Sequence, residues 1–143
     1  MLCFYHMKKA FVALTVIFFV NTLGLYYGWY HDFFWFDVAL HFLGGFFMAM
    51  LMANYLNEYF VNKNFIKNTL IIVGATVLIG VLWEFSEYLA NLVLGPIIYK
   101  WFAVKTYFMG DLDDTVSDLL MDILGAIAFS LLHLLRSRKA HQA

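Results

Sequence analysis

Six carboxylates and one histidine lie inside, or at the border of, stretches that are otherwise apolar. The clearest case is the pair Glu84 and Glu87, within residues 70–95, where most other side chains are hydrophobic. A charged side chain at the centre of a bilayer costs about 2.5–3.5 kcal/mol even on lenient scales, and such residues usually serve a function. We therefore take seven residues as the candidate functional site. They are Asp37, His41, Glu84, Glu87, Asp114, Asp118 and Asp122.

The chemistry of this set follows from its excess of negative charge. No Lys or Arg occurs at the same depth, so His41 is the only basic side chain available to the acids. Three uncompensated acids would cost on the order of 10 kcal/mol, which is comparable with the stability of a whole domain. Either shared protons or a bound cation must therefore balance the charge. Carboxylates with one imidazole suit a divalent ion such as Mg, Mn or Ca, and also Zn or Fe.

We predict that most of the set binds one divalent metal ion and that two members act in catalysis. The predicted metal ligands are His41, Glu84, Glu87, Asp118 and Asp122. Asp114 or Asp37 would serve as the general base. The structural alternative is that the acids nearest the helix starts only cap those helices, and that the deeper ones form hydrogen bonds that fix helix register.

Four apolar stretches must position these residues, and each is long enough to cross a hydrocarbon core of about 30 Å as a helix. Every backbone polar group in lipid needs an internal partner, so helices are the expected spanning form. We predict an all-α membrane protein, a single domain that forms a bundle of four transmembrane helices. The predicted spans are residues 10–30, 36–56, 66–95 and 114–135. Gly95 and Pro96 are expected to end the third span, and residues 97–110 to form an outer loop or surface segment.

The distribution of basic residues predicts the orientation. Seven Lys and Arg residues flank one side of the predicted bundle, and only Lys100 and Lys105 flank the other. Cytoplasmic loops carry an excess of basic residues, so both termini are expected in the cytoplasm of a bacterium, with the chain in its inner membrane. The seven are Lys8, Lys9, Lys63, Lys67, Arg136, Arg138 and Lys139.

This topology brings the candidate residues to one depth. The second and fourth spans enter from outside at Asp37 and Asp114, and the third ends there after Glu84 and Glu87. At 1.5 Å per residue, all of these groups fall within roughly 15 Å of the outer interface. On each span the acids also share one helical face with small residues, which predicts that they face the interior of the bundle.

Composition excludes several broad classes of protein. Of 143 residues, 64% are hydrophobic and 13% are charged, whereas soluble domains are about half apolar and about a quarter charged. A net charge of −1 argues against a nucleic-acid partner, and the single cysteine, Cys3, cannot form an internal disulfide. Lys8 and Lys9 precede an apolar run as in a signal peptide, but no small-residue cleavage pattern follows, so we expect an uncleaved helix.

Three segments together resemble a known family, the YjdF-like bacterial inner-membrane proteins, and more distantly the VanZ-like membrane proteins. The similarity covers residues 36–135 and implies a small multi-pass bundle with an acidic site near the outer leaflet. It implies no established reaction. The motifs that carry it are Asp37-x-x-x-His41, Trp83-Glu84-x-x-Glu87, and Gly110-Asp111-x-x-Asp114-Thr115-x-x-Asp118 followed by Gly125-Ala126.

Three functions remain open on the sequence alone. The first is a metal-dependent enzyme that acts on a lipid or lipid-linked substrate within the lipid bilayer. The second is a transporter coupled to protons or cations, in which the carboxylates form a relay. The third is a structural or regulatory membrane subunit with a polar core. We favour the enzyme, because the acids converge at one depth and no polar residues continue the path through the cytoplasmic halves of the second and fourth spans.

Overall fold

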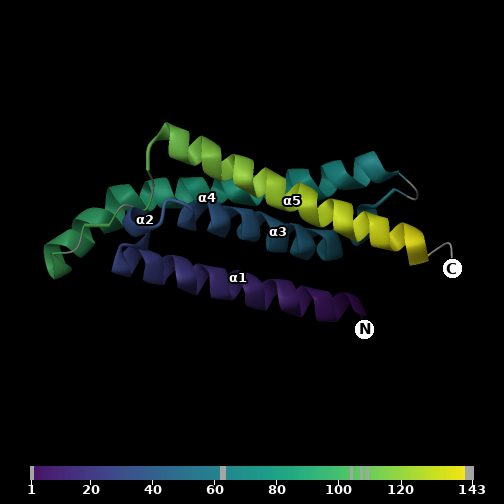
Figure 1. The fold of residues 1–143 in the computed structure, drawn as a ribbon, viewed down its shortest axis with the longest axis horizontal. Coiled ribbons are helices and arrows are strands. Elements are labelled where there is room, and N and C mark those ends of the chain that lie inside the picture. Colours follow the sequence, from purple (N-terminus) through teal and green to yellow (C-terminus); the bar gives the residue numbers. More distant parts are fainter. Residues whose placement is uncertain (1, 62–63, 104, 107, 109, 141–143) are drawn as a thin grey trace.

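Helices make up almost all of the described part of the chain, residues 2–61, 64–103, 105–106, 108 and 110–140 of this computed structural model. None of these residues forms a β-strand. Figure 1 shows the long helices packed lengthwise, with both chain termini at the same end of the bundle. The elements are α1 (Leu2–Tyr27), α2 (Trp29–Asp32), α3 (Phe36–Tyr55), the 3-10 helix η1 (Asn57–Tyr59), α4 (Phe65–Phe102) and α5 (Leu112–Ala140).

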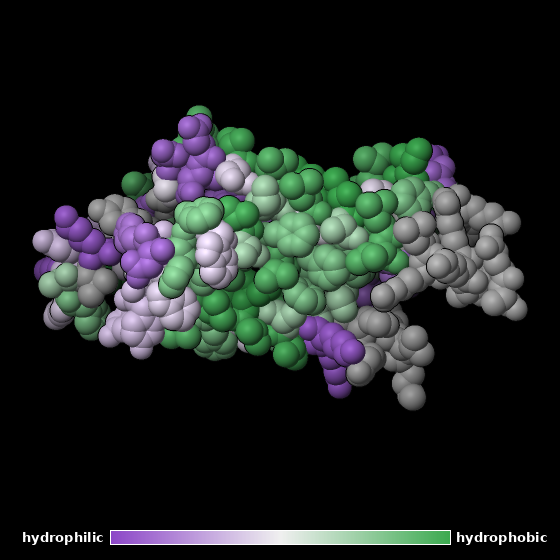
Figure 2. Space-filling view, in the orientation of Figure 1, coloured by the Kyte–Doolittle hydropathy of each residue, from purple (hydrophilic) through white to green (hydrophobic). Residues whose placement is uncertain are grey.

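Four of these helices are long and apolar enough to cross a membrane. Figure 2 shows hydrophobic surface around the middle of the molecule and hydrophilic residues toward its ends. The chain is thus a multi-pass membrane protein, and the predicted all-α bundle of four transmembrane helices is confirmed. The spanning segments are Met7–Tyr27, Phe36–Tyr55, Phe65–Phe102 and Leu112–His133.

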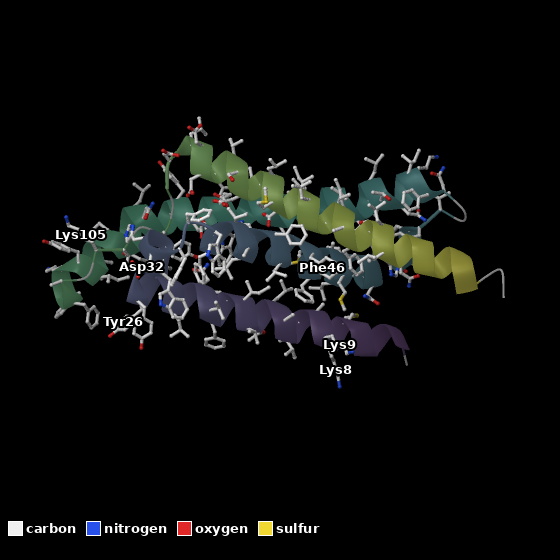
Figure 3. All side chains as sticks on the ribbon, in the orientation of Figure 1. Lys8, Lys9, Tyr26, Asp32, Phe46 and Lys105 are labelled. Carbon is white, nitrogen blue, oxygen red and sulfur yellow. The ribbon has the colours of Figure 1, made fainter. Side chains whose placement is uncertain are left out.

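The two ends of the bundle carry different parts of the chain. Lys8 and Lys9 lie at the end that holds both termini, which we call the terminal end (Figure 3). Asp32 and Lys105 lie at the opposite end, which we call the loop end (Figure 3). The prediction that both termini share one side is therefore confirmed, whereas the cytoplasmic location of that side stays a prediction. Lys63, one of the basic residues behind that prediction, lies outside the described residues.

α3 is the central helix of the bundle, and it lies against α1, α4 and α5. α3 and α5 approach each other closely where two glycines meet backbone atoms of the facing helix. A Cβ atom on Gly45 would overlap the backbone of Asp122, and one on Gly125 would overlap the carbonyl oxygen of Phe42. Small residues commonly mark such close crossings of membrane helices. The crossing fixes the register of α5 against α3.

The half of the bundle toward the terminal end is packed with apolar side chains. Two buried hydroxyl groups nearby, on Thr76 and Ser130, donate to carbonyl oxygens one turn earlier in their own helices. These two protons are therefore used within their own helices. A third buried hydroxyl, on Thr69, has no hydrogen-bond partner in the described part of the chain. The core residues are Ala49, Ala53, Ile72, Ala126 and Phe129.

The prediction that Gly95 and Pro96 end the third span is wrong, because α4 continues to Phe102. Proline inside a helix removes one backbone hydrogen bond, but transmembrane helices tolerate it where other groups compensate. The helix ends at Ala103, whose positive φ of 54° reverses the chain. Its 38 residues extend about 57 Å, so the last turns lie beyond a hydrocarbon core of about 30 Å.

The first span also ends differently from the prediction. Gly28, with a φ of 75°, adopts a left-handed conformation that glycine reaches without a steric penalty. This residue separates α1 from the one-turn helix α2. Tyr30, predicted within the first span, consequently lies in α2, where its hydroxyl donates a hydrogen bond of 2.9 Å to Asn21 Oδ1.

Replacing Asn68 with alanine is expected to lower stability by about 1–3 kcal/mol, because two buried hydrogen bonds are lost. The Asn68 side chain, 8% exposed, accepts from the Val61 backbone N–H at 2.8 Å and donates to the Val61 carbonyl at 3.1 Å. It thereby ties the chain after η1 to α4. Unfolding of purified protein in a detergent titration measures the loss. Lys67→Ala, at an exposed neighbouring position, is the control, and equal midpoints for the two variants would contradict this role.

Candidate functional site

Helix α3 brings the only histidine of the candidate set into the middle of the bundle. His41 is 8% exposed and lies one helical turn after Asp37, so both side chains project from the same face of α3. Ring contacts between Phe36 and both Trp29 and Tyr30 hold the start of this helix against α2. The loop end of α3 is therefore fixed by aromatic packing, not by a side-chain cap.

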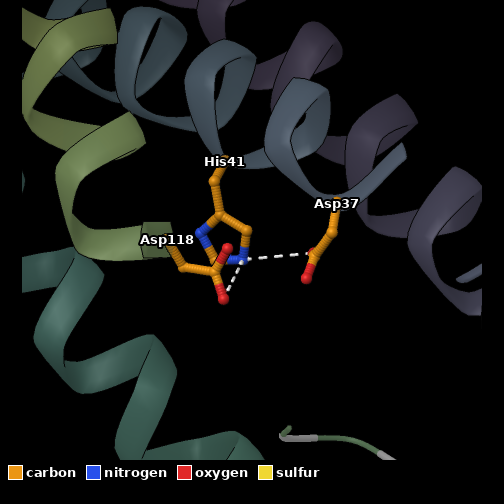
Figure 4. A group of neighbouring side chains, drawn as sticks. All are labelled: Asp37, His41 and Asp118. Carbon is orange, nitrogen blue, oxygen red and sulfur yellow. Dashed lines mark ion pairs between the residues drawn. The ribbon is translucent and has the colours of Figure 1, made fainter. Parts of the chain in front are cut away.

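One nitrogen of His41 faces two carboxylates. Figure 4 shows Nε2 between Asp37, from the same helix, and Asp118, from α5. The distances are 3.6 Å to Asp37 Oδ1 and 3.9 Å to Asp118 Oδ2. Both are ion-pair distances longer than an ordinary hydrogen bond. Asp118 is only 3% exposed, so the predicted inward orientation of this acid is observed.

The other nitrogen of His41 faces Asp122, at 3.6 Å from Nδ1 to Oδ1. Asp122 reaches this position because Gly45 and Gly80 leave room for it: a Cβ atom on Gly80 would overlap the Asp122 carboxylate. A carboxylate on the far nitrogen of a metal-binding histidine typically fixes the orientation of the ring. This geometry places Asp122, predicted as a ligand, behind the imidazole.

Helix α4 supplies two carboxylates that have different surroundings. Glu87 Oε1 accepts a hydrogen bond of 2.9 Å from the indole N–H of Trp83, one turn earlier. Glu84 is 5% exposed, and neither of its carboxylate oxygens has a hydrogen-bond partner among the described residues. A buried polar group without a partner is costly and calls for an explanation. Ser86 provides none, since its hydroxyl donates to the carbonyl of Leu82. The Thr115 hydroxyl of α5 lies near the Glu84 carboxylate, but the two do not form a hydrogen bond of ordinary geometry.

The side chains form two groups with the spacing needed to hold a metal ion. Asp37, His41 and Asp118 make one group, and His41, Glu84 and Glu87 make the other. Within each group one ligand atom per residue lies within 4.8 Å of the others. Oxygen ligands lie about 2.0–2.6 Å from Mg or Ca, so ligands on opposite sides of an ion are separated by about 4–5 Å. The buried Asp, Glu and His groups therefore have a spacing that could hold such an ion.

Asp114 lies apart from these two groups. Its carboxylate accepts a hydrogen bond of 3.1 Å from the backbone N–H of Gly110, and its own N–H donates to Asp111 Oδ1. These bonds fix the entry of the chain into α5, which corresponds to the structural alternative for this residue. The catalytic role predicted for Asp114 stays untested.

A cavity of about 260 Å³ lies beside the cluster, between α1, α3 and α4. Its polar lining includes Asp37, His41 and Asp122, together with two residues that the sequence did not single out as functional, Tyr30 and Asn21. Burial, and then the nearby Asp37 carboxylate, raises the pKa of the Tyr30 phenol, which therefore stays protonated as a hydrogen-bond donor. In the sequence, Tyr30 is one of several aromatic residues near the end of the first span, and nothing there indicates that it lines a cavity.

Comparisons with known proteins identify a family but no characterised relative. A family model described as "Predicted membrane protein (DUF2238)" matches residues 4–139. No curated protein and no solved structure matches the chain. The matched residues include all the candidate site residues and nearly all of the four long helices.

Proposed function

Since the chain belongs to the DUF2238 family of predicted membrane proteins, whose description gives no reaction, its function must be argued from the site. We propose that the cluster around His41 is a divalent-metal centre, and that the protein is an enzyme acting on a lipid or lipid-linked substrate. Asp118, Glu84 and Glu87 would share the ligation of the ion with His41, and Asp37 would lie beside it as the general base. The resemblance to YjdF-like and VanZ-like proteins, and a bacterial inner-membrane location, stay predictions beside this proposal.

The bare carboxylate of Glu84 is the observation that carries the proposal. Neither of its buried oxygens accepts a hydrogen bond of ordinary geometry, although the Thr115 hydroxyl of α5 lies nearby. A ligand atom of Glu84 also lies within 4.8 Å of one from Glu87 and one from His41. Water would ordinarily solvate such a group, and its burial is tolerated when a cation or proton neutralises it. Two carboxylates and one imidazole at metal-ligand spacing favour a divalent cation over a proton shared between two acids.

Asp37 is the better placed of the two predicted bases. It lines the cavity, and its carboxylate lies beside the Nε2 atom of His41. A metal ion there would polarise a substrate oxygen as a Lewis acid, while Asp37 would accept the proton of the attacking nucleophile. Asp114 instead uses its carboxylate to hold Gly110, and it lies outside both groups.

The packing of the terminal end favours an enzyme over a transporter. A proton or cation relay needs polar groups that continue from the cluster to the other side of the membrane. The described core beyond the cluster is apolar around Ile72 and Phe129, and the Thr76 and Ser130 hydroxyls bond within their own helices. Nearer the terminal end, Asn68 bonds to the Val61 backbone and the buried Thr69 hydroxyl has no hydrogen-bond partner in the described chain. The cavity runs from the cluster along apolar side chains such as Leu14 and Met48, as a pocket for an apolar substrate would.

We expect Mn²⁺ to bind the purified protein and to raise its unfolding temperature, with chelator reversing the effect. Mn²⁺ at 100 times its Kd would add about 2.7 kcal/mol to the folding stability. Electron paramagnetic resonance measures the bound ion, and thermal unfolding in detergent measures the stabilisation. Asp118→Asn should weaken Mn²⁺ binding, because it removes a buried ligand, whereas the exposed Asp113→Asn should leave binding unchanged.

Two outcomes would contradict this proposal. One is wild-type protein that binds no Mn²⁺, Mg²⁺ or Zn²⁺ and melts at the same temperature with and without them. The other is equal Mn²⁺ affinity in Asp118→Asn and wild type. If the variants fold and the ions do not bind, the carboxylates form a structural polar core, as in the third alternative that the sequence left open.

A further inference from the structure

The cavity between α1, α3 and α4 has one polar end and long apolar walls. On α1 the lining residues recur at intervals of three and four, so a single face of that helix is turned toward the cavity. No Cα atom of α1 lies within 8 Å of one of α4 in the described part of the chain, so the two helices stand apart across the cavity. The apolar lining comprises Leu14, Ile17, Phe18, Leu40, Met48, Ile79 and Trp83, with Gly44 between them.

The position of the cavity between α1 and α4 determines which kind of molecule can enter it. α1 and α4 both span the apolar belt and expose hydrophobic side chains such as Val16 and Leu78. Hydrocarbon chains therefore surround the space between these helices, and water does not. Typical pockets for drug-sized ligands measure about 300–1,000 Å³. A cavity of about 260 Å³ is below that range, which suits one hydrocarbon chain and not the paired chains of an ordinary bilayer lipid.

We infer that the cavity holds a single hydrocarbon chain of a lipid phosphate, with the phosphate against the His41 cluster. The chain position follows from the cavity alone, and the phosphate position rests on the metal centre proposed above. Carboxylates without an ion would repel a phosphate, whereas a divalent ion held by the same carboxylates binds phosphate oxygens directly. Charge complementarity thus makes the phosphate dependent on the ion.

Two neutral groups at the polar end fit an acceptor-rich head group. The Tyr30 hydroxyl donates to the side-chain oxygen of Asn21, Oδ1. The side-chain nitrogen of Asn21 is a donor, so it can bind an acceptor such as a phosphate oxygen. Both residues line the cavity, as do Asp37 and His41. A phosphate there would be held by the ion on one side and by the Asn21 amide N–H groups on the other, while the Tyr30 hydroxyl holds the Asn21 side chain in place.

Trp83 links the chain cavity to the metal cluster. Its indole N–H donates to Glu87 Oε1, and its ring contacts the edge of Phe18 on α1, with centroids 6.3 Å apart. Both aromatic residues line the cavity. A chain between α1 and α4 therefore contacts a side chain that is hydrogen-bonded to a proposed ligand, which places the hydrocarbon chain directly beside the proposed metal centre.

Photolabelling in detergent micelles tests the inference. The probe is a long-chain alkyl phosphate with a diazirine in its chain, and the matched probes carry an uncharged alcohol or a trimethylammonium head. We expect labels from the phosphate and alcohol probes to concentrate on the cavity walls, at Ile17 and Met48. Exposed Val16 should be labelled at least tenfold less. Removing Mn²⁺ with chelator should lower labelling by the phosphate probe at least tenfold and leave the alcohol probe unchanged.

Two pairs of variants provide matched controls. Gly44→Leu fills the cavity, because the nearest atom to a Cβ there is Asp122 Oδ1 at 4.0 Å, whereas Gly74 is exposed with nothing within 4 Å. Ile17→Trp fills the cavity from α1, and its neighbour Val16→Trp faces outward. Gly44→Leu and Ile17→Trp should each lower labelling at least tenfold with Mn²⁺ binding retained. Gly74→Leu and Val16→Trp should label as wild type.

The results separate failure of the inference from failure of the metal proposal. Alcohol-probe labels spread evenly over Val16 and the cavity walls would overturn the chain site, whether or not Mn²⁺ binds. Equal labelling by the phosphate probe with and without Mn²⁺, or stronger labelling by the trimethylammonium probe in the presence of Mn²⁺, would overturn the phosphate position. Wild type that binds no divalent ion, yet labels at Ile17 and Met48 with the alcohol probe, would contradict the metal centre and leave the chain site standing.

Discussion

Replacing Gly125 with leucine is expected to destabilise the folded bundle by about 3 kcal/mol or more and to abolish metal binding at the same time. A Cβ at this position overlaps the Phe42 carbonyl oxygen and approaches the Phe46 backbone nitrogen to 2.8 Å. Backbone atoms of a central helix cannot move aside as the end of a flexible side chain can. The larger side chain must therefore push α5 away from α3.

The separation would reach the candidate site directly. Asp118 and Asp122 lie on α5, and they face opposite nitrogens of His41 at 3.9 Å and 3.6 Å. A displacement of α5 by the width of a methyl group exceeds the tolerance of a metal centre, where ligand distances are set to within about 0.2 Å. Loss of stability and loss of Mn²⁺ affinity should therefore appear together in this variant.

A matched glycine provides the control for this prediction. Gly74 is exposed on α4, and a Cβ there meets no atom within 4 Å, so Gly74→Leu should change stability by about 0.5 kcal/mol or less. Gly125→Ala should already be destabilising, because its single Cβ atom is what overlaps Phe42. Detergent unfolding and Mn²⁺ titration measure both effects. A Gly125→Leu protein as stable as Gly74→Leu would show that α3 and α5 do not cross here.

The apolar stretches predicted most of the fold because a bilayer leaves the chain few choices. Length and hydropathy alone gave four spans, and α3, observed as Phe36–Tyr55, ends one residue before the prediction of 36–56. The errors lie at the helix ends, whose positions hydrophobicity does not determine. Pro96 is a strong helix-ending signal in water, but α4 passes through it to Phe102. The short helix α2 depends on the left-handed turn at Gly28, which hydropathy does not encode.

The sequence predicted which residues of the candidate site lie at similar positions along the bundle and face its interior. It did not predict which of them contact each other. Helical spacing placed Glu84, Asp118 and His41 on inward faces, and all three are buried. The rotation of α5 about its own axis depends on which glycines meet α3, so the sequence did not show that Asp122 would lie behind the imidazole. Tyr30 and Asn21 were missed because the cavity they line exists only when α1 stands apart from α4.

Glu84→Gln is expected to lower Mn²⁺ affinity by at least about 100-fold, since it removes a ligand, not merely a group that orients one. Neither oxygen of Glu84 accepts a hydrogen bond of ordinary geometry in the described chain, and the nearby Thr115 hydroxyl can donate to an amide oxygen as well as to a carboxylate. The amide therefore breaks no bond when it replaces the carboxylate. In chelator, the variant should therefore unfold at the same temperature as wild type or at a higher one. Neutralising a buried and uncompensated carboxylate removes a penalty.

The opposite signs distinguish a metal ligand from a structural acid. If Glu84 held the bundle together through hydrogen bonds, the glutamine variant would lose stability in chelator and in Mn²⁺ alike. If Glu84 binds the ion, the difference from wild type appears only when Mn²⁺ is added, as the missing rise in unfolding temperature. Glu58→Gln, an exposed acid in η1, is the matched control and should keep the full Mn²⁺-dependent rise. Equal Mn²⁺-dependent rises in the two variants would remove Glu84 from the metal centre.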